Sequence, residues 1–265
     1  MRPDQITRET ALFGLLGDGL EKSSDPDMIN RFFDGNGVDA FCSIFNIREE
    51  DMPFFLTQIK SKTIKALFVR PSHAAWCLEY LDIRDEVAEA TGFIDAAVIE
   101  NGLLRGMASA PAALMRDVRD KRVAILGNTP RAQAFALAAA LAGAGEICLA
   151  DDSLEELART GGMIRSRSAA AITYERCAPG AMTGIASADV VVNTLALGES
   201  MRIRYPEQAE VYDLTGSYPA QKARKYVRAE MILLSGVSFA VNQVLKIGTG
   251  VDERYADGAE ITEIF

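Results

Sequence analysis

Residues 121–152, KRVAILGNTPRAQAFALAAALAGAGEICLADD, decide the fold predicted for this chain. Val123–Leu126 is a short apolar run that predicts a strand, and Gly127 ends it. Pro130 stands where a first helical turn begins, and it is tolerated there because that N–H has no partner within the helix. Arg131–Ala142 is almost entirely Ala, Leu and Phe, which predicts a helix buried on most of its surface. The stretch therefore has the order strand, tight turn, helix and second strand.

This order is that of a dinucleotide-binding βαβ unit. In such a unit the turn and the helix N-terminus face a pyrophosphate, and a carboxylate after the second strand accepts the ribose hydroxyls. Asp151 follows the predicted strand Ile147–Ala150, at roughly the spacing of 20 residues expected of that carboxylate. A carboxylate repels a 2′-phosphate, and no Arg stands directly after this strand, so NAD is predicted rather than NADP.

The turn departs from the pattern G-x-G-x-x-G, which leaves an alternative open. It reads GNTPRA, with the first Gly present and Thr129 in place of the middle Gly. The chain from the turn to the second strand thus also fits an ordinary βαβ crossover without a cofactor. On the cofactor hypothesis the turn residues that bind the dinucleotide are Gly127, Asn128, Thr129 and Arg131, together with Asp151.

Composition narrows the class of protein and its partners. The chain has 265 residues, with 49% hydrophobic and 25% charged residues, as in soluble globular proteins of one large or two modest domains. The net charge of −9 argues against nucleic acid or an anionic membrane as a partner. The first residues, MRPDQITRET, lack the apolar core of a signal peptide, and the four cysteines have no metal-like spacing. A cytoplasmic protein with reduced thiols and no bound metal is predicted.

Alternating segments continue on both sides of this unit and predict an α/β fold with a largely parallel sheet in the first half. Predicted strands of the first half are Thr10–Gly17, Val38–Ile47, Ile64–Val69, Phe93–Ile99 and Leu103–Gly106, and predicted helices are Asp27–Asp34, Glu49–Lys60, Pro71 to about Tyr80, and Arg84–Thr91. In the second half, predicted helices are Pro111–Asp120, Leu154–Thr160, Tyr218–Val227 and Val237–Ile247, and predicted strands are Ala170–Tyr174, Asp189–Asn193, Ala209–Leu214 and Met231–Leu234.

Motifs along the chain resemble those of the shikimate/quinate dehydrogenase family. Gly17–Asn30 (GDGLEKSSDPDMIN) is similar to the family's G-N-P-x-x-H-S-x-S-P-x-x-H-N, with Ser23 at the first Ser and Asp25 at the second. In the family both hydroxyls hold the substrate carboxylate, so the resemblance implies that Ser23 and Asp25 bind substrate. A carboxylate at Asp25 would repel that group. Near the end, Gly236 and Gln243 match a Gly followed by Gln, and Gln243 is a further substrate-binding candidate.

Three further stretches carry the resemblance: Leu67–His73 is similar to N-V-T-x-P-x-K, Gly92–Ala96 to G-A-V-N-T, and Gly106–Ala113 to G-x-N-T-D-x-x-G. His73 replaces the Lys that mediates proton transfer, and Asp95 replaces a substrate-binding Asn. Ala110 replaces the Asp that pairs with the Lys. The family's N-x-T after a strand is similar to Asn193-Thr194, which with Gly236 completes the predicted cofactor-binding set.

The resemblance implies two domains. Residues 1–112 form an N-terminal α/β substrate-binding domain, on which a C-terminal helix at about 237–265 packs back, and residues 113–236 form a Rossmann-type dinucleotide-binding domain. Losing hydroxyl and amide donors in a dry site costs about 1–3 kcal/mol for each unpaired substrate group. Shikimate is therefore expected to be a poor substrate or none.

His73 is the only imidazole of the chain and its ordinary pKa of about 6.5 suits acid–base chemistry. One hypothesis makes His73 the acid/base and Asp95 the residue that orients it. The alternative is that His73 merely begins a helix after Pro71 and Asp95 is an ordinary carboxylate at a strand.

Three functions follow from these interpretations. The first is an NAD(P)-dependent oxidoreductase acting on the CH–OH group of a ring alcohol other than shikimate, with a small-molecule substrate and the state of a monomer or homodimer. The second is a non-catalytic relative that binds a cofactor or ligand. The third is a subunit that works through its surface.

Overall fold

The computed structural model describes residues 6–177, 183–195, 205–215 and 223–246. The chain divides into two compact units, one formed by the residues up to Ala110 and those from Leu233 onward, the other by Pro111–Ile232. The sequence predicts limits of 1–112 and 113–236. The first limit falls in α5 (Ser109–Leu114) and the second in α9 (Ala229–Leu245). Of the predicted C-terminal segment, residues 247–265 lie outside the described residues.

The unit of residues 111–232 is built on a six-stranded, entirely parallel sheet in the order β12-β11-β10-β7-β8-β9. Its strands are β7 (Arg122–Leu126), β8 (Glu146–Asp151), β9 (Ala171–Arg176), β10 (Val190–Asn193), β11 (Glu210–Asp213) and β12 (Lys225–Arg228). Read from β9, the strands follow the order 3-2-1-4-5-6 of a Rossmann fold. The central strands are apolar runs because both of their faces are covered.

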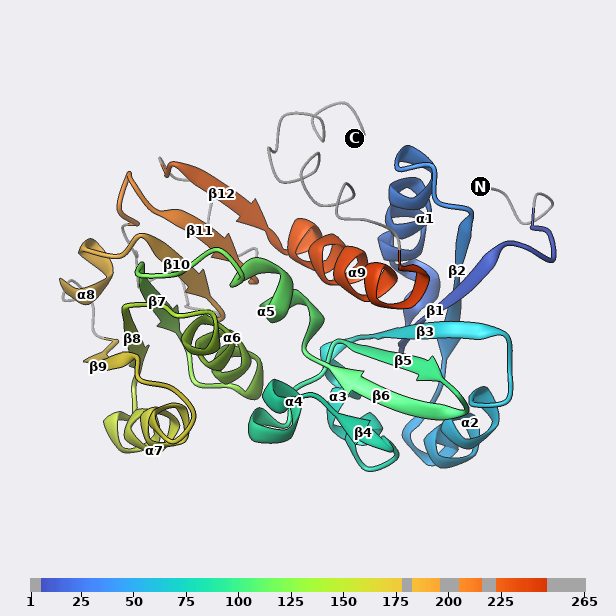
Figure 1. Ribbon diagram of the computed structural model, residues 1–265, viewed down its shortest axis with the longest axis horizontal. Coiled ribbons are helices and arrows are strands. Elements are labelled where there is room, and N and C mark those ends of the chain that lie inside the picture. The colour runs from blue at the N-terminus through green and yellow to red at the C-terminus, as the bar shows by residue number, and fades with distance from the viewer. Residues whose placement is uncertain (1–5, 178–182, 196–204, 216–222, 247–265) are drawn as a thin grey trace. The chain divides into compact units, whose positions relative to one another are not determined.

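Helices α6 (Pro130–Leu141) and α7 (Leu154–Arg165) pack side by side on one face of this sheet (Figure 1). The Ala-rich α6 is buried along most of its length because it lies over β7, β8 and β10. The short α8 (Thr183–Ala186) precedes β10. The predicted strand–turn–helix–strand unit at residues 121–152 is confirmed.

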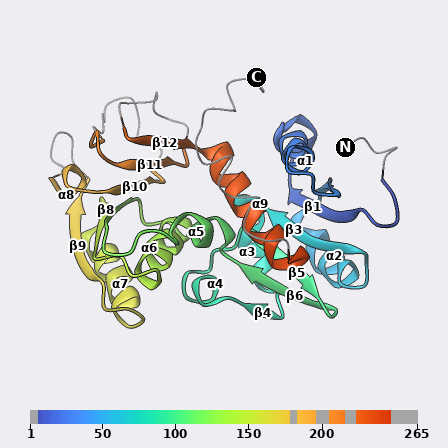
Figure 2. The ribbon, with the colours of Figure 1, turned by 45° about the horizontal axis from the view of Figure 1, so that its top comes forward.

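The other unit contains a mixed six-stranded sheet in the order β2-β1-β3-β5-β6-β4. Its strands are β1 (Ala11–Gly17), β2 (Ala40–Asn46), β3 (Ile64–Val69), β4 (Ile83–Arg84), β5 (Ala96–Glu100) and β6 (Leu103–Met107). Strands β1, β2 and β3 are parallel, and β5 runs antiparallel to both β3 and β6. Strand β4 is parallel to β6, and β6 has the direction of β1, β2 and β3, so β5 is the one reversed strand of the described sheet (Figure 2). The predicted, largely parallel sheet is therefore confirmed.

Besides α9, which belongs to this unit from Leu233 onward, short helices connect its strands. They are η2 (Leu20–Lys22), α1 (Asp25–Gly35), η3 (Glu49–Asp51), α2 (Met52–Ile59), α3 (Pro71–Leu78) and α4 (Glu86–Thr91). The core under α1 is aromatic: the ring of Phe13 lies 5.5 Å from that of Phe33 and 5.7 Å from that of Phe68. Helices α1 and α2 thus lie in the first two connections of the chain, from β1 to β2 and from β2 to β3.

Three predicted elements are wrong. The predicted helix Pro111–Asp120 is instead α5, which begins earlier and ends at Leu114. In the predicted helix Tyr218–Val227, residues 216–222 lie outside the described residues, and Lys225–Arg228 is strand β12, which pairs with β11. The predicted strand Met231–Leu234 belongs to α9, since a short apolar run fits a buried helix as well as a strand.

All four cysteines are free and buried, and burial raises the pKa of Cys42, Cys77 and Cys177 to about 12 and of Cys148 to about 11. The thiols are accordingly protonated and inert at neutral pH. Within the described ranges, the structure has no helix with the length and apolar character needed to cross a bilayer.

Candidate functional site

The centre of the parallel sheet contains a topological switch point. Strands β7 and β10 are neighbours, with Leu126 paired to Asn193, and their connections leave in opposite directions along the sheet, β7 toward β8 and β10 toward β11. In open α/β sheets, ligands bind outside the carboxyl ends of the strands at such a point. Gly127 and Thr194 follow these two carboxyl ends directly.

Gly127 makes a close approach that only glycine permits. Its φ of +103° is a conformation that L side chains rarely adopt, and a Cβ atom there would lie 2.3 Å from Thr194 Oγ1. Thr194 is fixed because both its backbone N and its Oγ1 donate to the Leu126 carbonyl, at 2.9 and 2.7 Å. Gly127 N donates to Ala150 O at 2.8 Å. The absence of a side chain at Gly127 therefore lets the turn after β7 pack against Thr194 at the switch point.

Thr129, which stands in place of the middle Gly of G-x-G-x-x-G, has a structural role in this turn. It is the N-cap of α6, and its hydroxyl accepts from Ala132 N at 3.3 Å. Asn128 is held by Thr160, whose hydroxyl donates to Asn128 Oδ1 at 2.7 Å, and by Gln133, whose amide donates to Asn128 O at 3.1 Å. Arg131 lies half-buried in the first turn of α6. The positive end of the α6 dipole thus stands at the carboxyl end of β7.

Asn193 ends β10 and is fully buried. Its Nδ2 donates to Asp213 Oδ1 at 3.4 Å, and its Oδ1 accepts from Leu195 N at 3.0 Å. Asp213 ends the neighbouring strand β11 and is 1% exposed. The sequence interpretation missed Asp213, although it ends an apolar strand just as Asn193 does.

Asp213 accepts several hydrogen bonds at this edge of the sheet. They come from Thr215 N at 3.0 Å, Thr215 Oγ1 at 2.8 Å and Tyr226 Oη at 2.5 Å, in addition to Asn193. Burial and this carboxylate raise the pKa of Tyr226, which keeps its hydroxyl protonated as a donor. Asp213 therefore links β10, β11 and β12 through one carboxylate.

Asp151 lies half-buried at the end of β8, and its Oδ1 accepts from Asp152 N at 2.6 Å. Arg176 pairs with it in register on β9 and donates from Nε to Asp152 O at 3.1 Å. The sequence directly after β8 gives no sign of Arg176, because the pairing of β9 with β8 brings this cation beside Asp151.

In the other unit, the predicted substrate-binding residues lie beyond the carboxyl ends of β1, β2 and β3. Asp25 forms an ion pair with Arg70, which directly follows β3. Ser23 Oγ accepts from Asp25 N at 3.2 Å, and Asn46 Oδ1 accepts from Leu20 N at 3.0 Å. The structure thus brings Ser23 and Asp25 together, and it adds Arg70 as a partner.

Gln243 lies exposed on α9. Gly236 lies on the same helix, where a Cβ atom would lie 2.9 Å from Ser109 Oγ and 3.1 Å from Ala110 N. Gly236 thus permits close packing of α9 on the start of α5 within the unit that contains both. This contact accounts for the glycine without a cofactor.

His73 is 1% exposed in the first turn of α3. Its Nε2 lies 2.9 Å from Ile47 O, which can only accept, so Nε2 carries a proton, and its Nδ1 lies within hydrogen-bond distance of Ser72 Oγ, at 2.9 Å. The ring also meets Trp76 edge-on at 4.8 Å. Both ring nitrogens are therefore engaged by the protein, as the structural alternative for His73 expects.

Asp95 directly precedes β5. Its carboxylate accepts hydrogen bonds from Ser109 N at 2.5 Å, Ser109 Oγ at 2.6 Å and Ala110 N at 2.9 Å. These groups form the start of α5, so the carboxylate caps that helix. His73 and Asp95 thus have different hydrogen-bonding partners, and the predicted orientation of one by the other has no support in these bonds.

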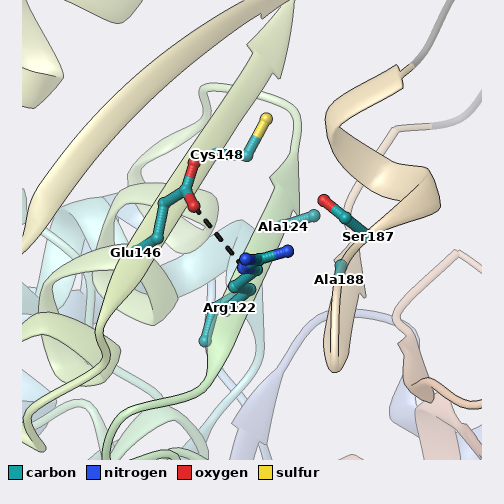
Figure 3. A pocket seen from close by; sticks show the side chains of 7 residues that line it. Arg122, Ala124, Glu146, Cys148, Ser187 and Ala188 are labelled. Atoms are coloured by element: carbon teal, nitrogen blue, oxygen red, sulfur yellow. Dashed lines mark ion pairs between the residues drawn. The ribbon is translucent and has the colours of Figure 1, made fainter.

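A small pocket lies at the opposite end of the parallel sheet, at the starts of β7 and β8 (Figure 3). Arg122 and Glu146 face each other there as an ion pair of 3.8 Å, with Cys148 beside them. Because Gly127 follows the other end of β7, this pocket is separate from the switch point. The described residues contain no cluster of side chains that would hold a metal ion.

The fold and the switch point define a two-domain α/β protein with a Rossmann-type dinucleotide-binding domain. No family model matches the chain. It is 28% identical over 207 residues to the shikimate dehydrogenase (NADP+) of Moorella thermoacetica, covering 75% of this chain and 70% of the relative. It is 25% identical over 255 residues, 90% of each chain, to that of Caldanaerobacter subterraneus subsp. tengcongensis. The chain is thus related to the shikimate dehydrogenases, which confirms the resemblance seen in its motifs.

Solved structures agree at the level of the fold. Shikimate 5-dehydrogenase from Listeria monocytogenes in complex with shikimate and NAD is similar with a TM-score of 0.75, 20% identity and 98% coverage of both chains. The 5-ketofructose reductase of Gluconobacter sp. strain CHM43 is similar with a TM-score of 0.77 and 16% identity, covering 95% of this chain and 99% of the other. The predicted two-domain α/β fold is confirmed.

Proposed function

We propose that this protein is an NAD(P)-dependent oxidoreductase acting on the CH–OH group of a ring alcohol other than shikimate. The observation that carries the proposal is the glycine turn at Gly127, which packs against Thr194 and leads into α6 at the switch point of a sheet with Rossmann strand order. The sequence relatives are dehydrogenases, which supports the reaction class.

Residues of the parallel-sheet unit fit a dinucleotide. Gly127 lets the turn after β7 pack closely against Thr194, and α6 begins with its positive dipole end beside that turn, where the charge of a phosphate would be stabilised. Asp151 stands where ribose hydroxyls are accepted, and Asn193 and Thr194 form the opposite lip of the switch point. A bound nicotinamide supplies the hydride chemistry, and these residues hold and orient the dinucleotide.

Three observations bear on whether the protein binds NAD or NADP. The relatives are named as NADP+ enzymes, which favours NADP over the NAD predicted from the sequence. The Asp151 carboxylate favours NAD, because it repels a 2′-phosphate. Arg176, paired with Asp151 in register, supplies the cation that a 2′-phosphate would need. We therefore propose a nicotinamide dinucleotide and assign its 2′ position to Asp151 and Arg176.

Departures from the family motifs support a substrate other than shikimate. Asp25 stands at a hydroxyl position, and its carboxylate is paired with Arg70. Leu67 stands at the family's Asn in N-V-T-x-P-x-K and is fully buried in the core. These two positions thus lack the neutral donors that the resemblance assigns to shikimate.

His73 was the predicted acid/base. Burial and its bonds to Ile47 and Ser72 favour the structural alternative, in which the imidazole links α3 to the segment after β2. This arrangement, with Ala110 at the position of the family's Asp, also favours the second candidate function, a non-catalytic protein that binds a cofactor. The two functions differ in whether bound dinucleotide is reduced by any ring alcohol.

Thermal unfolding in the presence of NAD, NADP and ADP tests the proposed function. A dinucleotide at a hundredfold excess over its Kd adds about 2.7 kcal/mol to the free energy of unfolding and raises Tm by roughly 5–10 °C. Absence of stabilisation by both dinucleotides would remove both candidate functions. Stabilisation without formation of reduced nicotinamide from a panel of cyclic alcohols would leave the non-catalytic function.

Replacing Asp151 with asparagine is expected to shift preference toward NADP. The change removes a negative charge beside the 2′ position and leaves Arg176 in place, so NADP affinity should rise relative to NAD by about tenfold. Isothermal titration with both dinucleotides measures the ratio. Glu155→Gln, on the exposed face of α7, is the control with the same charge change. An unchanged ratio in Asp151→Asn would withdraw the ribose assignment.

A further inference from the structure

The ion pair between Asp25 and Arg70 occupies a ligand-binding position of the first unit. Strands β1, β2 and β3 are parallel, and their carboxyl ends meet at one edge of the sheet. Open α/β sheets bind ligands beyond this edge. Arg70 follows β3 there, and its backbone N donates to Leu16 O at 3.0 Å, which fixes it to β1.

Asp25 is the better buried partner of the pair. Its side chain is 14% exposed and that of Arg70 is 42% exposed, and Arg70 Nη1 donates to Asp25 Oδ2. Asp25 also begins α1, where a negative charge is stabilised by the helix dipole, and its backbone N donates to Ser23 Oγ at 3.2 Å. The carboxylate is therefore stabilised by the Arg70 guanidinium and by the α1 dipole, while the guanidinium is the more exposed partner and keeps a surface open to ligand.

A guanidinium at such an edge is the natural partner of a ligand carboxylate. In this chain the protein supplies that carboxylate itself. A second, incoming carboxylate would meet Asp25 as a like charge or would have to displace it from Arg70. An uncharged hydroxyl-bearing ring meets neither cost, because hydroxyls can donate to Asp25 and accept from Arg70.

We propose that the Asp25–Arg70 pair makes the first unit select an uncharged polyol, one that lacks a carboxylate where the ring meets α1 and β3. The inference rests on the proposed oxidoreductase function and names the class of its substrate. Asp25 is the specificity-determining residue, since it cancels the charge of Arg70.

Shikimate and its methyl ester test this selection, because the two ring polyols differ only in the carboxylate charge and in the methyl group that removes it. We expect the unmodified protein to bind the ester at least about tenfold more tightly than the acid by isothermal titration. Asp25→Asn, which frees Arg70, should reverse or erase that ratio through a gain of at least about tenfold in affinity for the acid. Asp27→Asn, an exposed position on the same helix, is the matched control and should keep the original ratio.

Asp25→Ser serves as a second variant that restores a hydroxyl if Asp25→Asn unfolds. Equal or tighter binding of the acid by the unmodified protein would overturn the proposal, as would an unchanged ratio in folded Asp25 variants. If neither compound binds the unmodified protein or any folded variant, the proposal is also overturned, since the ester belongs to the proposed class. Dinucleotide binding is measured separately, so a failed proposal here is distinguishable from failure of the oxidoreductase function.

Discussion

Gly127→Ala is expected to lower dinucleotide affinity at least about tenfold, and Gly127→Val to abolish measurable binding. A Cβ atom would enter the space of Thr194 Oγ1 at 2.3 Å, and Leu195 would be its next neighbour at 3.4 Å. The backbone φ of +103° adds strain of about 1–3 kcal/mol for any residue with a side chain. The turn can relieve the contact and the strain only by moving, and its N–H groups then leave the positions in which we propose that they face a phosphate.

Gly143→Ala is the matched control for this experiment. Gly143 also has a positive φ, of +88°, and follows α6 at its other end, where a Cβ atom would come no closer than 3.6 Å, to Arg119. The control should lose stability from strain but keep its dinucleotide affinity. Thermal unfolding measures the stability of each variant, and titration with NAD and NADP measures its dinucleotide affinity.

The double variant Gly127→Ala/Thr194→Ala separates the two causes. It removes the contact with Oγ1 and leaves the unfavourable φ, so it should recover part of the lost affinity. If Gly127→Ala binds dinucleotide as well as the unmodified protein does, the switch point is not the cofactor site and the proposed function loses its main support.

Local pattern was enough to predict the βαβ unit, because its signals lie within one stretch. The apolar run before Gly127, Pro130 at the first turn and the Ala-rich helix are each read from neighbouring residues. Local pattern predicts a helix at β12 and a strand near the start of α9, and both predictions are wrong. There, Lys225–Arg228 becomes a strand through pairing with β11, a tertiary effect that overrides local preference.

The hydrogen-bonding and ion-pair partners of the candidate site residues could not be predicted from the sequence. His73 Nε2 is hydrogen-bonded to the carbonyl of Ile47, 26 residues earlier, and Asp25 is paired with Arg70, 45 residues later. Neither partner is marked by spacing, because parallel strands bring distant residues to one edge. The resemblance to a family located these positions, and only the fold shows which charges they cancel.

Asp213→Ala is expected to reduce the free energy of unfolding by about 3–5 kcal/mol, the range for breaking a buried, fully bonded carboxylate cluster. The donors from Asn193, Thr215 and Tyr226 lose their common acceptor at once. Since Asp213 is 1% exposed, water does not readily replace it. Chemical denaturation of the unmodified and variant proteins measures the change.

Tyr226→Phe tests whether the cluster acts as a unit. It removes one donor and should cost about 1–3 kcal/mol, and Asp213→Ala should cost less in this background than alone because fewer donors are left unpaired. Asp189→Asn is the control: this exposed residue precedes the other end of β10, and its Oδ2 accepts from Arg122 N at 2.9 Å.

A milder change links the cluster to function. Asp213→Asn keeps the shape of the side chain but turns one acceptor into a donor that faces the other donors, so Asn193 at the switch point loses its fixed orientation. Dinucleotide affinity should then fall by about tenfold in folded protein, whereas Asp189→Asn leaves it unchanged. Unaltered affinity in Asp213→Asn would show that Asn193 contributes packing alone and that recognition depends on the turn at Gly127.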